Sequence, residues 1–333
     1  MTTGPHPARR DLGVDDAALL DRLIEVYPFN SHRNYRMVPR KRQAAVLKAE
    51  IGYAYRAPDE SLAAVVAGGS AEAVAVCRRL TWDSDWFGVP MARLDYILRS
   101  EEAGRETLAH AVAAALEKCR KAGVKHVTAR LDVADTDGIA VVEDHGFRLM
   151  DNLATYLYHP KQPTPPPVKT VGTVRPFVPG DAAQILEITR EAYCGVRPRF
   201  FGRFHRDPHI PSERADEMYL EWARKCCSGE RAQRVFVAED NQGRLIGYLA
   251  VQLVEPVSSA GGVRIFAGVL GACRRDQPGA YAGLIHVPTV EHHAAGAATE
   301  GQTQNFHFST VRIYEVIGAQ YVRADYTFHA WLG

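Results

Sequence analysis

A proline-rich segment from Lys161 to Thr170, KQPTPPPVKT, sets the strongest limit on how this 333-residue chain folds. Consecutive prolines supply no backbone donors and favour an extended conformation, so the segment cannot lie inside a helix or a sheet. A chain of this length has room for about two domains of ~150 residues. We therefore expect one domain over residues 1–160, a linker over 161–170 and a second domain over 171–333.

The half before the linker alternates between short apolar runs and amphipathic stretches, which is typical of an α/β domain. Two runs turned by Gly68, Gly69 and Ser70 predict a hairpin over residues 60–80. Further strands are expected over 91–98, 125–132 and 147–159, and helices over 106–123 and 135–146.

The half after the linker begins the same alternation again, so the two halves are loosely similar. Ser212 is a plausible N-cap for a helix over 212–226, and a helix over 280–296 is expected to break or kink at Pro288. The remaining expected elements are strands 173–178, 264–273 and 319–332, helices 180–193 and 309–318, and a hairpin over 234–254. The fold class is α/β (α+β), with largely antiparallel pairing and flanking helices.

Composition excludes several classes of function. Forty Lys and Arg against 39 Asp and Glu give a net charge of +1, so no field for nucleic acid or an anionic membrane is expected. The apolar runs fall far short of the ~20 residues that a membrane span needs, and no signal-peptide pattern begins the chain. The six cysteines form no CxxC, which favours reduced thiols and a cytoplasmic protein.

The segment from Gly268 to Ile285, GVLGACRRDQPGAYAGLI, passes from an apolar strand through a polar turn into a helix. This arrangement presents the unpaired N–H groups of a helix N-terminus, which bind anions such as phosphate. A plain strand-to-helix connection has the same pattern, so both interpretations stay open at this point.

The turn resembles the pyrophosphate loop of GNAT acetyltransferases, written [Q/R]-x-x-G-x-[G/A]. Ala280 departs from the central glycine of that pattern. The block STVRIYEVIG also resembles the closing helix of the family, with Tyr314 a few residues before Gly318. The resemblance implies a GNAT-type mixed sheet and acetyl-CoA or another short acyl-CoA as co-substrate. It places the CoA-binding loop at Gln277, Pro278, Gly279, Ala280, Tyr281 and Ala282.

Three further segments, LTWDSDWFGVPMARL, GFRLMDN and GRFHRDPHIPSERADEMYLEWARK, resemble the TDP-fucosamine acetyltransferase branch of GNAT proteins. That branch joins a partial N-terminal GNAT-like half to a full acyltransferase domain. The resemblance starts near Arg79 and leaves the first seventy-odd residues unmatched. It implies that Tyr314 is the general acid, that Asp151 is a base acting through water, and that Asn305 or His307 makes a polar contact to the cofactor.

Each candidate has a structural alternative. Main-chain N–H groups around Leu270 and Ala272 suit an oxyanion, whereas Tyr314 also suits a packed core position and Asp151 a turn or cap. A basic cluster suits a sugar nucleotide diphosphate or is a solvated face. Its members are Arg203, His205, Arg206 and His209.

No metal is expected. Adjacent residues on a helix diverge by ~100°, so His292 and His293 cannot share one ion. The acidic run Asp132, Asp135 and Asp137 is better explained by the N-terminal turn of a helix.

These observations favour an acyl-CoA-dependent N-acyltransferase that acts on the amine of a nucleotide-linked amino sugar. Transfer to another small-molecule amine and a non-catalytic CoA-binding module are the alternatives. The expected partners are small molecules, with neither nucleic acid nor membrane among them. The sequence leaves the oligomeric state, including a homodimer, open.

Overall fold

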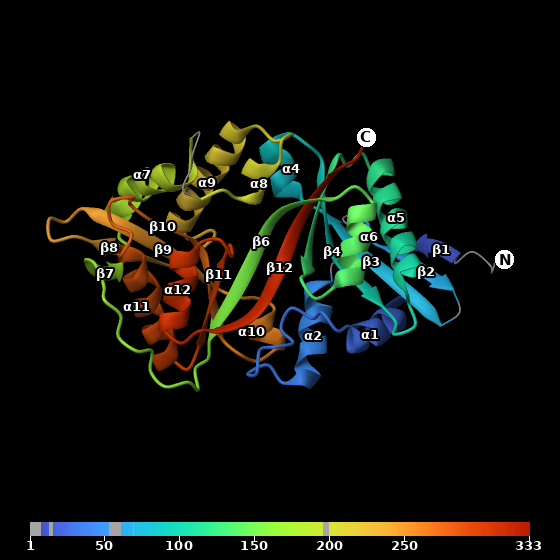
Figure 1. Ribbon diagram of the computed structural model, residues 1–333, viewed down its shortest axis with the longest axis horizontal. Helices are drawn as coiled ribbons and strands as arrows, with labels where there is room; N and C mark the ends of the chain where they lie inside the picture. Colours follow the sequence, from blue (N-terminus) through green and yellow to red (C-terminus); the bar gives the residue numbers. More distant parts are fainter. Residues whose placement is uncertain (1–7, 13–15, 53–60, 69, 196–199) are drawn as a thin grey trace. The chain divides into compact units, whose positions relative to one another are not determined.

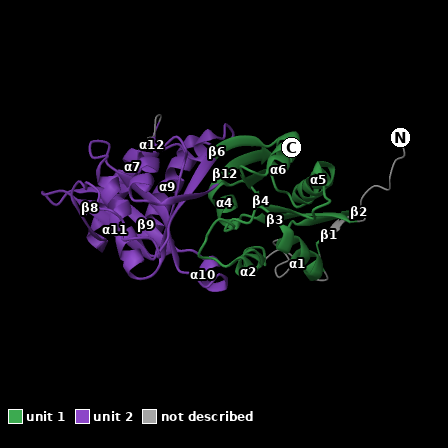
Figure 2. Ribbon diagram, turned by 60° about the horizontal axis from the view of Figure 1, so that its bottom comes forward, with its two compact units in different colours: residues 1–151, 324–333 green, residues 152–323 purple. Residues whose placement is uncertain are grey.

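The computed structural model describes residues 8–12, 16–52, 61–68, 70–195 and 200–333. Contacts within the chain separate two compact units (Figure 2). Unit 1 holds residues 1–151 and 324–333, and unit 2 holds residues 152–323. The chain passes between them inside strand β6 (Arg148–Tyr158) and inside strand β12 (Gln320–Trp331).

Unit 1 is a sheet in the order β1-β2-β3-β4-β5-β12. The β4/β5 pair is parallel, and the other pairs are antiparallel. Besides β12, its strands are β1 (Ala8–Asp11), β2 (Ala64–Gly68), β3 (Ala71–Arg79), β4 (Met91–Arg99) and β5 (His126–Asp132). Its helices are α1 (Ala17–Val26), α2 (Arg40–Glu50), α4 (Thr81–Phe87), α5 (Arg105–Lys121) and α6 (Thr136–Asp144).

Unit 2 is a sheet in the order β6-β11-β10-β9-β8-β7, in which only β10/β11 is parallel among the described pairs. Its own strands are β7 (Thr173–Pro176), β8 (Arg234–Glu239), β9 (Leu245–Leu253), β10 (Ile265–Cys273) and β11 (Ala298–Thr303). Its helices are the 3₁₀ turn η2 (Pro179–Asp181), α7 (Ala182–Tyr193), α8 (Arg203–Arg206), α9 (Ser212–Cys227), α10 (Val257–Ala260), α11 (Ala280–Ala294) and α12 (Phe308–Val316).

The two units repeat one topology. The order β1-α1-α2-β2-β3-β4-α5-β5-α6 in unit 1 matches β7-α7-α9-β8-β9-β10-α11-β11-α12 in unit 2 (Figure 1). The first seventy-odd residues, which the sequence resemblance leaves unmatched, therefore have a place in the fold, because they supply β1, α1 and α2. The predicted fold class, a mixed and largely antiparallel sheet flanked by helices with a second half of the same type, is confirmed.

Helices cover both faces of each sheet, as the apolar patterns require. In unit 1, α1 and α2 pack over Val74, Val76 and Leu98, and α5 packs over the opposite face at Ala75 and Ile97. In unit 2, α7 and α9 cover one face, and α11 and α12 cover the other. No helix in the described part of the chain is long and apolar enough to cross a membrane.

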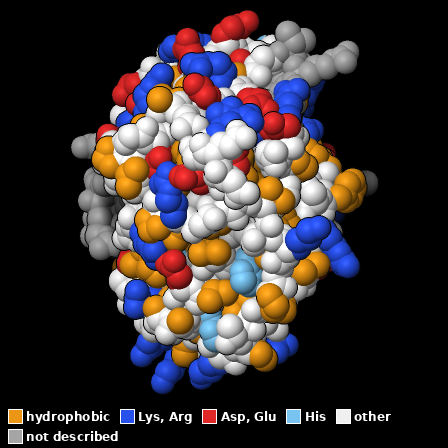
Figure 3. Space-filling view, turned by 90° about the vertical axis from the view of Figure 1, so that its left-hand side faces the viewer, with side chains coloured by type: hydrophobic (Ala, Val, Ile, Leu, Met, Phe, Trp, Pro, Cys, Tyr) orange, Lys and Arg blue, Asp and Glu red, His pale blue; other side chains and the backbone are white. Residues whose placement is uncertain are grey.

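The surface does not show a uniform charge on the face drawn in Figure 3. Lys and Arg side chains are interspersed there with Asp and Glu, and hydrophobic side chains are scattered between them (Figure 3). All six cysteines are free thiols. The mixture of charges agrees with the balanced composition.

Several local expectations need correction. Pro211, not Ser212, is the N-cap of α9, and α11 continues through Pro288 without a break. The strand β11 had no sequence prediction. The proline-rich segment forms neither helix nor strand from Pro163 to Thr170, and it packs on unit 2, where Val168 joins the apolar cluster of Tyr314. The domain boundaries around residues 161–170 stay a prediction.

Candidate functional site

The strands β10 and β11 diverge after three paired residues. Ile265, Phe266 and Ala267 pair in parallel with residues 298–300. Beyond these pairs, β10 stays bound to β9 as far as Cys273, and β11 stays bound to β6 as far as Thr303. A bulge between Gly268 and Leu270 marks the point of divergence. Among the described residues, the facing edges of the two strands have lost their mutual ladder.

The register shows which backbone groups lie on the open edge of β10. Arg274 donates its N–H to Ile246 O of the β9 side at 2.9 Å. Hydrogen-bonded pairs alternate in an antiparallel ladder, so Ala272 and Leu270 also direct their N–H groups toward β9. Gly271 therefore faces the open edge, and its carbonyl accepts a hydrogen bond from Tyr193 Oη at 2.8 Å. The proposed oxyanion donor accordingly moves from Leu270 and Ala272 to the N–H of Gly271.

Two tyrosines from α11 and α12 contact these strands at glycines. A Cβ placed on Gly271 would lie 3.0 Å from Tyr281 Oη, and one placed on Gly301 of β11 would lie 2.0 Å from Tyr314 Oη. The Tyr314 ring also stacks on Tyr156 of β6, with centroids 5.1 Å apart and an interplanar angle of 11°. The glycines are thus needed at positions where phenol groups approach the backbone.

Tyr314 is 8% exposed, and its hydroxyl has no hydrogen-bond partner among the described residues. Burial raises the pKa of Tyr314 well above its usual value, and the neighbouring Tyr281 and Glu300 raise it further. The phenol is therefore protonated at neutral pH. A protonated hydroxyl without a partner is able to donate to a ligand atom placed beside it.

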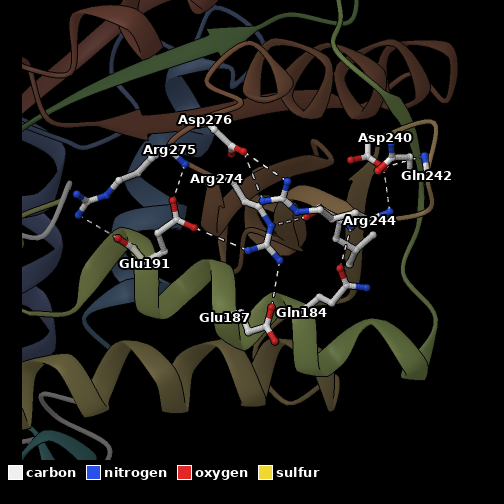
Figure 4. A network of polar contacts seen from close by, with 10 residues as sticks. Gln184, Glu187, Glu191, Asp240, Gln242, Arg244, Arg274, Arg275 and Asp276 are labelled. Atoms are coloured by element: carbon white, nitrogen blue, oxygen red, sulfur yellow. Dashed lines mark hydrogen bonds and ion pairs between the residues drawn. The ribbon is translucent and has the colours of Figure 1, made fainter.

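The turn that follows β10 is fixed by a charged network (Figure 4). Arg275 donates its N–H to Glu191 Oε1 at 2.6 Å, and Arg274 bonds Glu187 Oε2 at 3.1 Å. Both carboxylates come from α7. On the other side of the turn, Arg244 approaches Asp276 Oδ2 at 3.4 Å. These contacts hold the entrance to α11 in one place.

The predicted CoA loop lies directly at the N-terminus of α11, as the pattern requires. Gly279 is exposed, and its N–H has no protein partner in the described chain, whereas Ala280 N–H bonds Gln277 O at 3.1 Å and Pro278 has no N–H. Ala282 N–H reaches Gly279 O at 3.3 Å. The positive end of a 15-residue helix suits an anion, but this loop offers fewer unbonded donors than a loop without proline.

The basic cluster lies on α8 and in the turn that follows it. His205 Nε2 lies 2.9 Å from Asp216 Oδ1, and the imidazole stacks on Tyr219 with centroids 5.4 Å apart. Tyr219 stacks in turn on Tyr193 at 4.4 Å, which connects the cluster to Gly271 on β10.

The other members of the cluster have different surroundings. The guanidinium of Arg206 lies 4.9 Å from the ring centroid of Phe306, in the loop between β11 and α12. Arg203 lies over its neighbour Phe204 at 4.4 Å, and His209 is exposed. Gln304 Nε2 donates to Phe201 O at 2.6 Å and so ties that loop to the cluster. The segment 196–199 lies outside the described residues.

The remaining predicted residues are dispersed around these strands. Asn305 donates its N–H to Asn152 Oδ1 at 3.2 Å, and His307 contacts the Phe200 ring edge-on at 4.9 Å. Asp151 is buried in β6 and belongs to unit 1. Alternation along β6 puts Asp151 on the face opposite to Asn152, so its role as a base stays a proposal.

Sequence reasoning missed Glu300 and Tyr193. Glu300 is 7% exposed and is the last residue of β11 that pairs with β10, on the strand face opposite to that of Gly301. A buried carboxylate beside the open strand edges is a candidate base. His292 and His293 bind separate groups, Thr299 Oγ1 at 2.9 Å and Gln162 O at 2.8 Å, so they do not converge on one ion.

Comparison with known proteins gives the class of fold. No family model matches the chain. A GCN5-related N-acetyltransferase from Sphaerobacter thermophilus has a TM-score of 0.58 at 17% identity, with 99% of this chain and 97% of that chain covered. A tandem GNAT protein from the clavulanic acid biosynthesis pathway has a TM-score of 0.53 at 14% identity, covering 98% and 99%. The chain therefore has the fold of GCN5-related N-acetyltransferases in a tandem arrangement.

One curated protein is similar to this chain in sequence. The spore coat polysaccharide biosynthesis protein SpsD of Bacillus subtilis (strain 168) is 30% identical over 158 residues. The match covers 47% of this chain and 50% of SpsD, so the chain spans half the length of that relative.

Proposed function

We propose that the protein is an acyl-CoA-dependent N-acyltransferase. The observation that carries this proposal is the divergence of β10 and β11, with Gly271 on one edge and the Tyr314 hydroxyl against Gly301 on the other. Unpaired strand edges supply amide donors and acceptors, which match the amide groups along the pantetheine arm of CoA. The α11 N-terminus beyond β10 matches the pyrophosphate. The free thiols support a cytoplasmic location.

The side chains divide the reaction between them. The amine nitrogen attacks the thioester carbonyl, the new C–N bond forms, and the C–S bond breaks. Gly271 N–H is suitably placed to stabilise the oxyanion, because its edge of β10 is open. Tyr314 donates its proton to the departing thiolate. From reference pKa values of ~10 for tyrosine and ~8.5 for a thiol, this transfer is uphill by about 2 kcal/mol before the site changes either value.

The amine must lose a proton, and two carboxylates are candidates for the base. Asp151 follows from the resemblance to the TDP-fucosamine branch and would act through water. Glu300 follows from the geometry, since it is buried one residue before Gly301. Substituting each by its amide separates them, because the true base should lose ~10²–10⁴ in rate and the other should not.

For the acceptor we propose the amine of an amino sugar linked to a nucleotide. The polysaccharide context in the name of SpsD supports a sugar. Arg206 stacked on Phe306, together with Phe308 at 78% exposure, offers cationic and aromatic surfaces beside the loop after β11. Guanidinium groups suit a diphosphate, and aromatic rings suit a base or a sugar face.

The test is thiol release from acetyl-CoA by the full chain with a panel of amines. The panel contains amino sugars linked to nucleoside diphosphates, the same free amino sugars and simple alkylamines. We expect release with the nucleotide-linked compounds at the lowest KM. Equal turnover of alkylamines would contradict the acceptor assignment but keep the transferase.

A non-catalytic CoA-binding module is the second candidate. The specific observation in its favour is the loop, where Pro278 removes one donor and Ala280 N–H is bonded internally. This function predicts that acetyl-CoA raises the melting temperature while no amine of the panel releases thiol.

A further inference from the structure

Unit 1 contains the same strand divergence as unit 2. Its β4 and β5 pair in parallel over only four residues, Met91–Leu94 with His126–Ala129. The β4 and β10 strands are each 9 residues long. Each carries an extra residue at its fifth position, Asp95 in β4 and Val269 in β10, where the register shifts against the preceding strand.

The matching registers show what stands at the reacting positions in unit 1. Counting from the first parallel pair, Ile97 falls where unit 2 has Gly271, and Ala129 falls where it has Gly301. Counting along the two nine-residue helices, Val142 of α6 falls where α12 has Tyr314. All three side chains are fully buried. Unit 1 thus has apolar side chains in place of the two close-approach glycines and the hydroxyl.

The ends of β4 and β5 are bridged by the segment between α1 and α2. Arg33 bonds Asp132, the last residue of β5, at 2.5 Å. Arg99, the last residue of β4, bonds Asp135 at 2.5 Å. The Phe29 ring lies 5.0 Å from the Arg99 guanidinium and 5.8 Å from that of Arg33. The Phe29 ring therefore contacts two guanidinium groups, that of Arg99 at the end of β4 and that of Arg33, which binds the end of β5.

Neighbouring residues hold this segment in place. Tyr27 packs edge-on against Phe29 at 5.8 Å and against Tyr96 of β4 at 6.0 Å. The Tyr96 hydroxyl donates to Glu50 of α2 at 2.6 Å, and Ser31 Oγ lies 3.3 Å from the same hydroxyl. Burial raises the pKa of Tyr27, so its phenol stays neutral among these charges.

The turn from β4 to α5 also differs from its counterpart in unit 2. It carries Glu101 and Glu102, both exposed, at the place where unit 2 has the loop before α11. Counted back from the first helical residue, Glu101 falls where unit 2 has Asp276, and Glu102 falls where it has Gln277, so unit 1 has one more carboxylate to repel a pyrophosphate there.

We propose that the segment Tyr27–Arg33 is a built-in occupant of the strand divergence in unit 1, so that each chain binds a single acyl-CoA, in unit 2. The naming of acyl-CoA as the excluded ligand rests on the proposed function. The N-terminal residues, which the sequence resemblance does not cover, thereby have a role. They complete a second acyltransferase-shaped half and close its ligand position with their own side chains.

The first test is independent of any ligand. Arg33→Ala and Phe29→Ala are compared with Arg36→Ala, which removes an exposed arginine three residues away. We expect amide hydrogen exchange in residues 97–99 and 129–132 to accelerate at least tenfold in the first two variants and to stay unchanged in the control. Exchange rates equal to those of the parent protein in both Arg33→Ala and Phe29→Ala would overturn the inference, whether or not the protein binds CoA.

The second test measures binding to the full chain by calorimetry and hydrogen exchange with acetyl-CoA. We expect one site per chain, with new protection in the Gln277–Ala282 loop and none in residues 27–33 or 97–102. Two sites per chain, or protection in those unit 1 segments, would overturn the inference. If acetyl-CoA does not bind at all, the proposed function is refuted. The exchange comparison above then decides by itself whether Tyr27–Arg33 occupies the strand divergence of unit 1.

Discussion

Gly301→Ala tests the position of the Tyr314 ring against strand β11. The added Cβ would lie 2.0 Å from Oη, 2.2 Å from Cζ and 2.4 Å from Cε1 of the Tyr314 ring. Ordinary contacts of a Cβ begin at ~3.4 Å, so the ring must move by more than ~1 Å. It cannot do so freely, because the ring is stacked on Tyr156 with centroids 5.1 Å apart.

Overpacking of this kind costs about 1–3 kcal/mol of the free energy of unfolding. A displacement of ~1 Å at a reacting group costs on the order of 10² in rate. Thermal unfolding and thiol release would measure both effects. Gly180→Ala is the matched control, since a Cβ there meets nothing within 4 Å. Parental stability and a rate within threefold in Gly301→Ala would refute the placement of the ring against β11.

We also expect effects from a charge placed in the loop before α11, from the titration of His292 and from removal of β6. Pro278→Glu, in the exposed loop before α11, should weaken acetyl-CoA binding at least tenfold through like-charge repulsion. Pro208→Glu, at another exposed proline, is the control and should leave the affinity unchanged. Equal affinities of the two variants would show that the loop does not bind acetyl-CoA. Burial lowers the pKa of His292 from 6.5 to about 4, so its folded form resists protonation and stability falls as pH drops below 6.5. We expect the free energy of unfolding of the parent to fall by ~2 kcal/mol for this reason between pH 7 and 5, and this fall to be absent in His292→Gln. Identical pH profiles of stability in the two proteins would contradict the prediction. A chain starting at residue 171 lacks the β6 partner of β11 and should melt at a lower temperature than one starting at residue 152.

Most strands and helices were predictable because their apolar periodicity is strong. The hairpins β2/β3 and β8/β9 and the helices α5 and α7 form where the pattern places them. The strand β11 was not predictable, since ATEGQT has neither alternation nor β-branched residues at regular positions. Its course is fixed by its partners β6 and β10, which tertiary contacts alone bring together.

The site was predictable only where local pattern determines it. The turn before α11 follows from strand, polar turn and helix, and the structure has that order around Gln277. The proposed roles of Gly271 and Glu300 depend on register, which sequence spacing does not determine. The closure of unit 1 by Phe29 depends on contacts between residues about 70 to 100 positions apart, so no local motif announces it.

One substitution tests whether the Tyr314 hydroxyl protonates the departing thiolate, as proposed above. Tyr314→Phe keeps the ring and its stacking on Tyr156 and removes only the oxygen that lies against Gly301. Because the hydroxyl matters as charge develops, we expect unchanged acetyl-CoA affinity and a fall of ~10²–10⁴ in the rate of thiol release when chemistry limits the rate. A folded variant that binds acetyl-CoA and turns over within threefold of the parent would contradict it and make Tyr314 a core residue.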